Sequence, residues 1–114
     1  MGGSTLILRR GDIALVVAAG DYGKPRPAVI VQSDLFNETH ASLTVCPVTS
    51  LLVEAPLFRI ALKPSRASGI ERVSQIMVDK IQTLRRDRIR ERIGAIPPAT
   101  MRDVEAALRL WLRV

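Results

Sequence analysis

The chain has 114 residues, a length typical of one domain that buries a core without disulfides or bound metal. Its formal net charge is +6 and its sequence pI is about 10.7, which favours a polyanionic partner such as nucleic acid or an acidic protein. One histidine and one cysteine cannot build a zinc site, so we expect no metal and no cofactor. A single cysteine also cannot form an internal disulfide, which favours a reducing compartment.

The apolar run at residues 6–8 is too short for a signal sequence or a membrane span, so we expect a cytoplasmic protein with no membrane partner. No repeat, low-complexity tract or linker interrupts the sequence, and a single domain is expected over residues 1–114. All predicted elements are therefore expected to share one fold.

Runs of apolar and β-branched side chains predict strands through most of the chain. The expected strands are residues 13–17, 28–32, 42–50, 57–62, 72–84 and 92–96. Two glycines mark a flexible connection at 18–23. Ser33 as an N-cap and Asn37 as a stop predict a single helical turn between the second and third strands. The arginine-rich residues 85–89 predict another short turn of helix.

Pro97 and Pro98 open the long helix that the sequence predicts at the C-terminal end, since proline is tolerated in a first helical turn. An apolar stripe with helical spacing is expected to face the sheet; it consists of Met101, Val104, Leu108 and Trp111. Charged residues are expected to face water; they are Arg102, Asp103, Glu105 and Arg109. Five or six antiparallel strands closed by this helix predict a mainly β fold, a small half-open barrel.

Arg26 stands between Pro25 and Pro27 at the start of a predicted strand. Proline fixes φ and removes a backbone donor, so the two prolines hold this segment extended and out of any helix. A guanidinium on such a stiff mount suits a phosphate group, because its planar fork keeps its charge and bonds two oxygens at once. The alternative from this segment alone is an ordinary arginine, solvated or salt-bridged on a loop.

Two further polar pairs interrupt apolar strands. Thr49 and Ser50 place two hydroxyls at the end of the third predicted strand, where they could act on a ligand or cap a turn. Asp79 and Lys80 form a charge pair inside an otherwise apolar run, and a carboxylate there needs a partner unless it lies on the solvent face of the strand. Taken singly, both pairs are explained by structure alone.

Other residues have simpler interpretations. Cys46 lies in an apolar strand and is expected to be an inert core residue, and His40 is expected to be a solvated loop residue. Residues 85–92 contain five arginines against Asp87 and Glu91, which suits a surface that RNA approaches, a docking surface for an acidic protein or a solvated turn. Tyr22, beside Asp21 in the first connection, could supply a ring that stacks on a base.

The ordered set of motifs resembles the MazF/PemK toxins of bacterial toxin–antitoxin pairs. The resemblance covers the chain from about Arg10 to Leu112, and although each motif is short, the order and spacing of the set are specific. The matching segments are Arg10-Gly11-Asp12-Ile13, Lys24 to Gln32, Val45 to Ser50, Val78 to Leu84 and Ile93-Gly94.

This resemblance implies an SH3-like half-open antiparallel barrel of the CcdB/MazF/PemK type that forms a homodimer. It also implies a metal-independent, sequence-selective endoribonuclease that cuts single-stranded RNA, inhibits translation and is blocked by a cognate antitoxin. The net charge of +6 suggests that this antitoxin is acidic. By the matching motifs, Arg26, Thr49 and Asp79 are expected to be catalytic. The residues expected to bind the substrate are Lys24, Ser50, Lys80 and Tyr22.

The implied chemistry is compatible with these residue types. RNA carries its own nucleophile, the 2′-hydroxyl, so the protein has to align it, move protons and stabilise the charge that develops at phosphorus. Arg26 does not readily give up a proton, which makes Asp79 the more ordinary general base if it lies within reach. Lys80 and Met77 depart from the family pattern, where glutamine and, in some relatives, arginine occupy these positions.

Two other functions are compatible with the sequence. One is a non-catalytic toxin of the CcdB kind, which shares this fold and binds DNA gyrase through a tryptophan near the C-terminus, the region of Trp111. Another is a degenerate member that only binds its antitoxin. The presence of both Arg26 and Thr49 favours the nuclease, because a gyrase-binding toxin has no need of a phosphate-directed pair.

Overall fold

The computed structural model of the chain describes residues 6–18, 20 and 22–114. Ala19 and Asp21, in the predicted connection at 18–23, lie outside the described residues. The elements follow one another as β1 (Asp12–Val16), β2 (Arg26–Ile30), α1 (Asp34–Asn37), β3 (Ser42–Thr49), β4 (Arg59–Leu62), β5 (Ser74–Met77), η1 (Val78–Lys80), β6 (Gln82–Arg85), η2 (Arg86–Arg88), β7 (Ile89–Ala95) and α2 (Pro98–Leu112).

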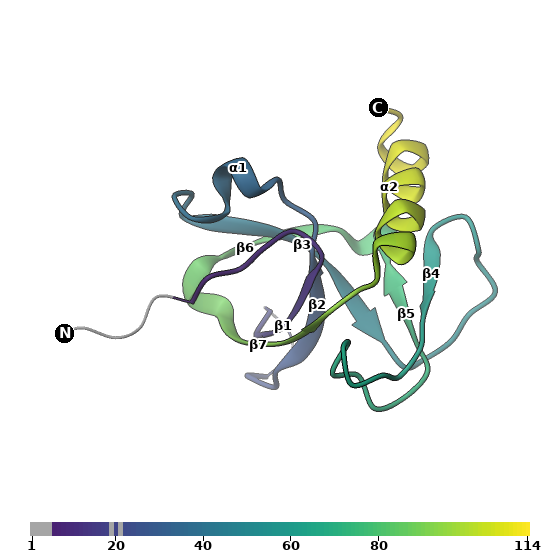
Figure 1. The fold of residues 1–114 in the computed structure, drawn as a ribbon, viewed down its shortest axis with the longest axis horizontal. Helices are drawn as coiled ribbons and strands as arrows, with labels where there is room; N and C mark the ends of the chain where they lie inside the picture. The colour runs from purple at the N-terminus through teal and green to yellow at the C-terminus, as the bar shows by residue number, and fades with distance from the viewer. Residues whose placement is uncertain (1–5, 19, 21) are drawn as a thin grey trace.

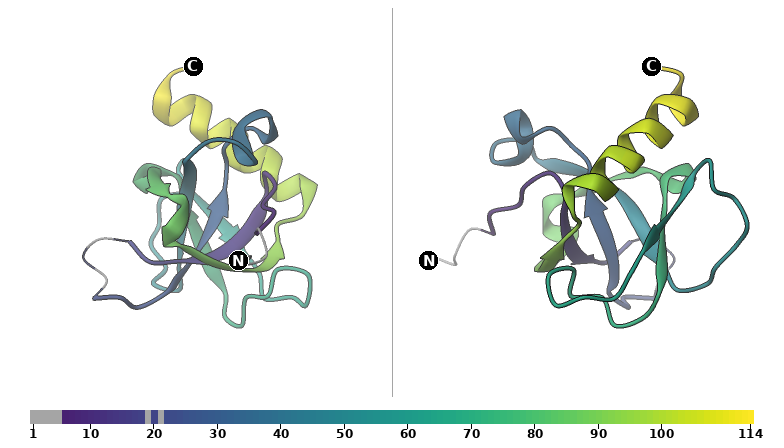
Figure 2. Two further views of the ribbon diagram at one scale, coloured as in Figure 1. Left: turned by 90° about the vertical axis from the view of Figure 1, so that its left-hand side faces the viewer. Right: turned by 45° about the vertical axis from the view of Figure 1, so that its right-hand side comes forward.

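The strands form one antiparallel sheet in the order β4-β5-β3-β2-β1-β7, and β6 also pairs with β3. The long strand β3 is its central element, because its first half pairs with β6, its second half with β5, and β2 lies along its other edge. The sheet curls around its core and α2 crosses one side of it (Figure 1; Figure 2). The predicted mainly β half-open barrel with a C-terminal helix is confirmed.

Two apolar clusters fill the fold, one on each face of β1, β2 and β3. Ile13, Val29 and Cys46 are register partners across these strands, and all three are fully buried in the cluster that includes Val104 and Ala107 of α2. Their strand neighbours point to the opposite face, into the cluster completed by β6 and β7; these neighbours are Ala14, Ala28, Ile30 and Val45. Burial on both faces explains why the strand sequences are continuously apolar.

The predicted single strand at 72–84 is wrong, because the chain breaks there into β5, η1 and β6. β5 pairs with the second half of β3, whereas β6 pairs with its first half. The 3₁₀ helix η1 turns the chain between these two partners, with the Val78 amide donating to the Phe58 carbonyl and the Ile81 amide to the Val78 carbonyl. Asp79 and Lys80 consequently lie in this turn and not on a strand face. The short helical turn expected at 85–89 is present as η2.

The apolar stripe of α2 packs on the sheet as predicted at Met101, Val104 and Leu108. Trp111 stays 47% exposed, with its ring 5.3 Å from that of Phe58. Within the described residues, no helix is both long enough and apolar enough to cross a membrane.

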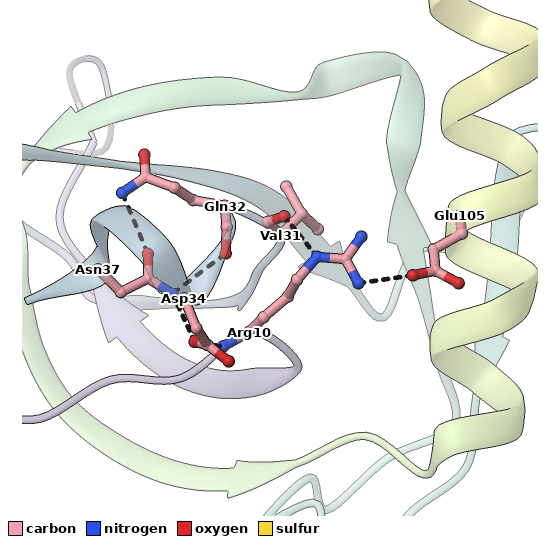
Figure 3. A network of polar contacts seen from close by, with 6 residues as sticks. All are labelled: Arg10, Val31, Gln32, Asp34, Asn37 and Glu105. Atoms are coloured by element: carbon pink, nitrogen blue, oxygen red, sulfur yellow. Dashed lines mark hydrogen bonds and ion pairs between the residues drawn. The ribbon is translucent and has the colours of Figure 1, made fainter. Parts of the chain in front are cut away.

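Glu105 does not face water freely, contrary to the prediction. Its carboxylate accepts a hydrogen bond from the Arg10 guanidinium at 2.6 Å, and Arg10 also donates to the Val31 carbonyl at 3.0 Å (Figure 3). The backbone amide of Arg10 donates to Asp34, which in turn accepts from the buried Asn37. This network connects the segment before β1 to α1 and to α2. Arg10 of the Arg10-Gly11-Asp12 motif therefore has a structural role.

Candidate active site

Arg26 and Thr49 are brought together by the antiparallel pairing of β2 and β3. Arg26 is the first residue of β2 and Thr49 the last residue of β3. The observed register ends with Ala28 paired to Pro47, and two residues beyond this pair lie Arg26 on β2 and Thr49 on β3, at the same end of the two strands. The sequence alone predicted that the two side chains lie at two strand ends. The antiparallel pairing brings the start of β2 beside the end of β3.

Two hollows of similar size flank this pair. One has a volume of about 290 Å³ and extends toward the loop 69–72 and Ile93; the other is about 280 Å³ and extends toward Val16, Met77 and Gln82. The residues that line both are Arg26, Pro27, Val48 and Thr49. The arginine–threonine pair therefore stands between two concave surfaces, and a ligand bound at the pair can extend into either.

Arg26 is exposed and its charge is directed to solvent. Among the described residues, no carboxylate lies within ion-pair distance of its guanidinium, although four other arginines of the chain are paired. Its backbone is held by pairing with Val16 in β1 and by the restricted φ of the prolines on either side. A charged, planar donor is thus held in position without an internal partner.

Thr49 is half-buried and has a defined hydroxyl orientation. Its Oγ1 accepts a hydrogen bond from the Leu51 amide at 3.1 Å. A hydroxyl that accepts in this way keeps its own O–H to donate, and the stiff χ1 of threonine limits where its oxygen lies. Ser50, the next residue, lines the first hollow, so both predicted hydroxyls belong to the site.

The far wall of the first hollow was not predicted from the sequence, and it is rigid. Gly69 has φ +71°, and a Cβ added there would lie 2.2 Å from the Ile93 carbonyl oxygen. A Cβ at Gly94 would lie 2.3 Å from the Ser68 backbone, so the 65–69 turn and β7 meet backbone to backbone. The buried Ser68 hydroxyl accepts from the Ile70 amide and donates back into the same turn. The signal for this wall was the two glycines.

Asp79 lies outside both hollows. Its two carboxylate oxygens accept hydrogen bonds from Arg59, at 2.8 Å from Nε and 3.1 Å from the second guanidinium nitrogen. The two side chains are 16% and 12% exposed, and the Arg59 hydrogen bonds hold the pKa of Asp79 below its ordinary value. The structure therefore does not bring Asp79 to the Arg26–Thr49 pair; it explains the carboxylate within an apolar run as half of an ion pair.

The other expected substrate-binding residues are not among those that line the two hollows. Tyr22 is fully exposed with φ +52°, and Lys24 is exposed in the same connection before β2. Lys80 is exposed on η1, beside the Asp79 ion pair. Among the sequence-predicted residues, the structure thus gathers Arg26, Thr49 and Ser50.

Two arginines of the 85–92 cluster join distant parts of the chain. Arg86 donates to the carbonyls of Asn37 and His40, and Arg92 contacts the buried Asp12 at 3.1 Å. Arg85 pairs with Asp87, two residues away, on the exposed surface. Arg86 and Arg92 therefore have structural roles.

Cys46 behaves as a core residue. It is fully buried, and burial, aided by the nearby charge of Asp79, raises the pKa of its thiol to about 12. A thiol held protonated in this way is a poor nucleophile.

A curled antiparallel sheet closed by one helix, with an unneutralised arginine and a threonine between two hollows, defines a small basic barrel protein whose site suits a phosphodiester. Comparison with known proteins agrees. Residues 9–112 match the family described as PemK-like, MazF-like toxin of type II toxin-antitoxin system, and the chain belongs to this family.

Individual relatives support the same assignment. The chain is 42% identical over 108 residues to the probable endoribonuclease MazF of Mycolicibacterium smegmatis, covering 94% of this chain and 98% of that protein. It is 26% identical to endoribonuclease EndoA of Bacillus subtilis, with 94% and 96% covered. Its fold is similar, at a TM-score of 0.80 and 23% identity, to a mycobacterial endoribonuclease solved in complex with its cognate antitoxin, with 94% and 96% covered.

Proposed function

We propose that this MazF-type endoribonuclease toxin cleaves single-stranded RNA without a metal ion, through attack of the RNA 2′-hydroxyl on the adjacent phosphorus. The observation that carries the proposal is that Arg26 and Thr49 together line two adjoining hollows, with the Arg26 side chain exposed to solvent. The 42% identity to a probable endoribonuclease MazF supports it independently.

In the proposed reaction the 2′-oxygen forms a bond to phosphorus as its proton leaves, and the bond from phosphorus to the 5′-oxygen breaks as that oxygen gains a proton. The products are a 2′,3′-cyclic phosphate and a 5′-hydroxyl. Arg26 binds the phosphate oxygens on which negative charge develops, and the Thr49 hydroxyl donates a further hydrogen bond to them. Each contact is stronger in the transition state than in the ground state, which is the condition for catalysis.

The proton acceptor has to lie close to this pair. Asp79 can serve only by giving up its two hydrogen bonds to Arg59, whereas Glu71 lines the first hollow together with Arg26 and Thr49. We therefore place Glu71 ahead of Asp79 as the candidate general base. Glu71→Gln is expected to lower kcat more than Asp79→Asn does.

Selectivity for sequence is proposed to come from the two hollows, which would hold the bases on either side of the cleaved bond. We propose that the toxin also inhibits growth, because destruction of mRNA stops translation. We propose that Tyr22 and Lys24, which are exposed before β2, contact the RNA beyond these two bases, by stacking and by charge.

The proposed partners are an acidic antitoxin and a second copy of this chain. The mycobacterial relative was solved with its cognate antitoxin, and the net charge of +6 favours an acidic segment that lies over the Arg26 hollows and blocks them. Exposed apolar side chains leave surface available for a homodimer; they include Leu57, Leu110 and Leu112.

The alternative of a CcdB-like toxin that binds gyrase draws on Trp111, which is half exposed near the C-terminus. Its ring packs on Phe58 at 5.3 Å, which is a structural role, and the named relatives are endoribonucleases. The nuclease function is therefore preferred.

The deciding experiment incubates the purified protein with a long RNA in excess EDTA and identifies the ends of the fragments. We expect cleavage to persist and to leave 2′,3′-cyclic phosphate (or its hydrolysis product) and 5′-hydroxyl ends. Fragments with 5′-phosphate ends would mean attack by water and would contradict the mechanism. Arg26→Ala is expected to lose this cleavage. Arg109→Ala, which removes an exposed arginine of α2, is its matched control and should cleave as the unmodified protein does.

A further inference from the structure

The loop that follows Thr49 has to be held in place by polar contacts. Leu51, Leu52 and Val53 are 75%, 51% and 43% exposed, so burial of their side chains contributes little to ordering this segment. The loop between β3 and β4 projects beyond the body of the sheet (Figure 2). Yet its first turn supplies the amide of Leu51, which fixes the Thr49 hydroxyl.

Gln75 holds this loop with both ends of its side-chain amide. Its Oε1 accepts from the Val53 amide at 3.1 Å, and its Nε2 donates to the Val53 carbonyl at 2.8 Å. The side chain thus imitates a neighbouring strand for one residue of the loop. Its own backbone is fixed inside β5, in register with Thr49 of β3 on one side and Ala61 of β4 on the other.

These contacts close a ring around Thr49. The backbone of Thr49 pairs with Gln75, the Gln75 amide grips Val53, and two residues earlier the Leu51 amide donates back to Thr49 Oγ1. The ring sets the direction of one lone pair of the hydroxyl and leaves its hydrogen to donate outward. If the loop were released, the hydroxyl could turn and the oxygen would lose its fixed donor.

We propose that Gln75 is a positioning residue of the active site, which acts on catalysis through the loop 50–53 and the orientation of the Thr49 hydroxyl. The inference rests on the proposed RNA cleavage at Arg26 and Thr49. It adds a residue that lines neither hollow and acts without touching the phosphate. Its effect is expected on kcat, because the hydroxyl serves the transition state, and not on the affinity for RNA.

A second glutamine, Gln32, holds backbone groups with both ends of its amide at the start of β3, the end opposite to Thr49. Gln32 donates from Nε2 to the Ser42 carbonyl at 3.2 Å, and its Oε1 accepts from the Thr44 amide at 3.2 Å. Gln32 thus bonds backbone groups of β3 in the way that Gln75 bonds those of Val53, but its contacts lie at the other end of β3 from Thr49. Gln32→Ala is therefore the control for loss of a glutamine clamp without a link to the site.

The test measures kcat and KM for RNA cleavage by the full-length protein, with thermal unfolding followed in parallel. Gln75→Ala is expected to lower kcat by about 10- to 100-fold, the scale of misplacing a reacting group, with KM within about twofold of the original. Gln32→Ala is expected to lower the melting temperature and leave kcat unchanged. Equal kcat for Gln75→Ala and the unmodified protein would overturn the proposal.

A double-mutant cycle with Thr49→Ala tests the route of the effect. If Gln75 acts through Thr49, adding Gln75→Ala to Thr49→Ala lowers kcat no further. A further loss as large as in the unmodified background would mean that Gln75 acts on its own, and the positioning role would be wrong. Absence of cleavage by the unmodified protein would instead refute the proposed function.

Gln75→Glu keeps the length of the side chain and decides the matter should Gln75→Ala not fold. Its carboxylate cannot donate to the Val53 carbonyl at neutral pH, whereas its protonated form can. The ratio of its kcat to that of the unmodified protein is expected to rise as the pH falls toward the ordinary pKa of a glutamate side chain. A ratio that does not change with pH would count against the clamp.

Discussion

Arg26 and Arg59 begin two strands of the same sheet, and their surroundings are opposite. Arg59, at the start of β4, is 12% exposed and bonds both oxygens of Asp79. Arg26, at the start of β2, is exposed, and no carboxylate of the described residues neutralises it. The Arg59 guanidinium is neutralised by a carboxylate within the fold, whereas the Arg26 guanidinium is available to bind an anionic ligand.

The difference shows how two chemically identical residues divide between structure and function. A largely buried ion pair gives up hydration that its mutual attraction must offset, so it is used where the fold requires two strands and a turn to meet. The exposed Arg26 guanidinium forms no ion pair with the described residues, so its charge does not contribute to the fold in this way. Loss of Arg26 should therefore affect activity alone, and loss of Asp79 should affect stability alone.

The largest expected effect is on catalysis by Arg26→Ala. Removing the main charge-stabilising donor should lower the rate of RNA cleavage by about 100- to 1,000-fold. The urea midpoint should stay unchanged, because the side chain makes no ion pair with the described residues. Single-turnover cleavage and urea unfolding measured on the same preparation check both parts. A variant that cleaves at the original rate would remove Arg26 from the mechanism.

The second expected effect, on Asp79→Ala, is the reverse. Removing this carboxylate leaves the Arg59 guanidinium largely buried without a partner, which should cost about 2 kcal/mol of unfolding free energy. The expected cost is below that of a fully buried pair because both side chains keep some access to water. Cleavage per folded molecule should change less than threefold, on the order of 0.5 kcal/mol. A collapse of activity with normal stability would restore Asp79 to the catalytic set that its motif implies.

Local patterns predicted the strands, the Ser33 cap and the long helix well, since each depends on residues close in sequence. Ser33 does accept from the Leu35 amide, and α2 does begin at Pro98. They failed at 72–84, where the apolar run looks like one strand. There the break at η1 is set by β3, which offers its second half to β5 and its first half to β6.

Side-chain partners were the least predictable part of the site. Asp79 and Arg59 are 20 residues apart, Gln75 and Val53 are 22 apart, and Arg10 and Glu105 are 95 apart. No periodicity connects such pairs, because the fold brings them together only after the strands have found their register. Arg26 and Thr49 could be proposed because they sit at strand ends within recognisable motifs, whereas the rigid wall at Gly69 and Gly94 left only the glycines as a signal.

A third expectation concerns pH and separates the two arginines further. The pKa of Asp79 is lowered in the folded state by Arg59, so the pair's contribution to stability is fully present above the unfolded-state pKa of about 3.9. That contribution is lost as the pH falls through the lower folded-state value. The unfolding free energy of the unmodified protein should therefore drop toward that of Asp79→Asn on acidification. Urea unfolding of both proteins across the acidic range measures the difference, and a constant gap would contradict this linkage.

The smallest expected effect belongs to a third arginine, whose exposure lies between those of Arg26 and Arg59. Arg10 and Glu105 are 30% and 33% exposed at their ion pair, so water screens most of their attraction. Glu105→Gln removes the charge and keeps an acceptor for the guanidinium, and it should cost no more than about 0.5 kcal/mol at low salt. At about 1 M salt the Debye length shrinks to roughly 3 Å and the cost should disappear. A larger or salt-independent cost would show that the contact between α2 and the segment before β1 depends on this charge pair as strongly as η1 depends on Arg59.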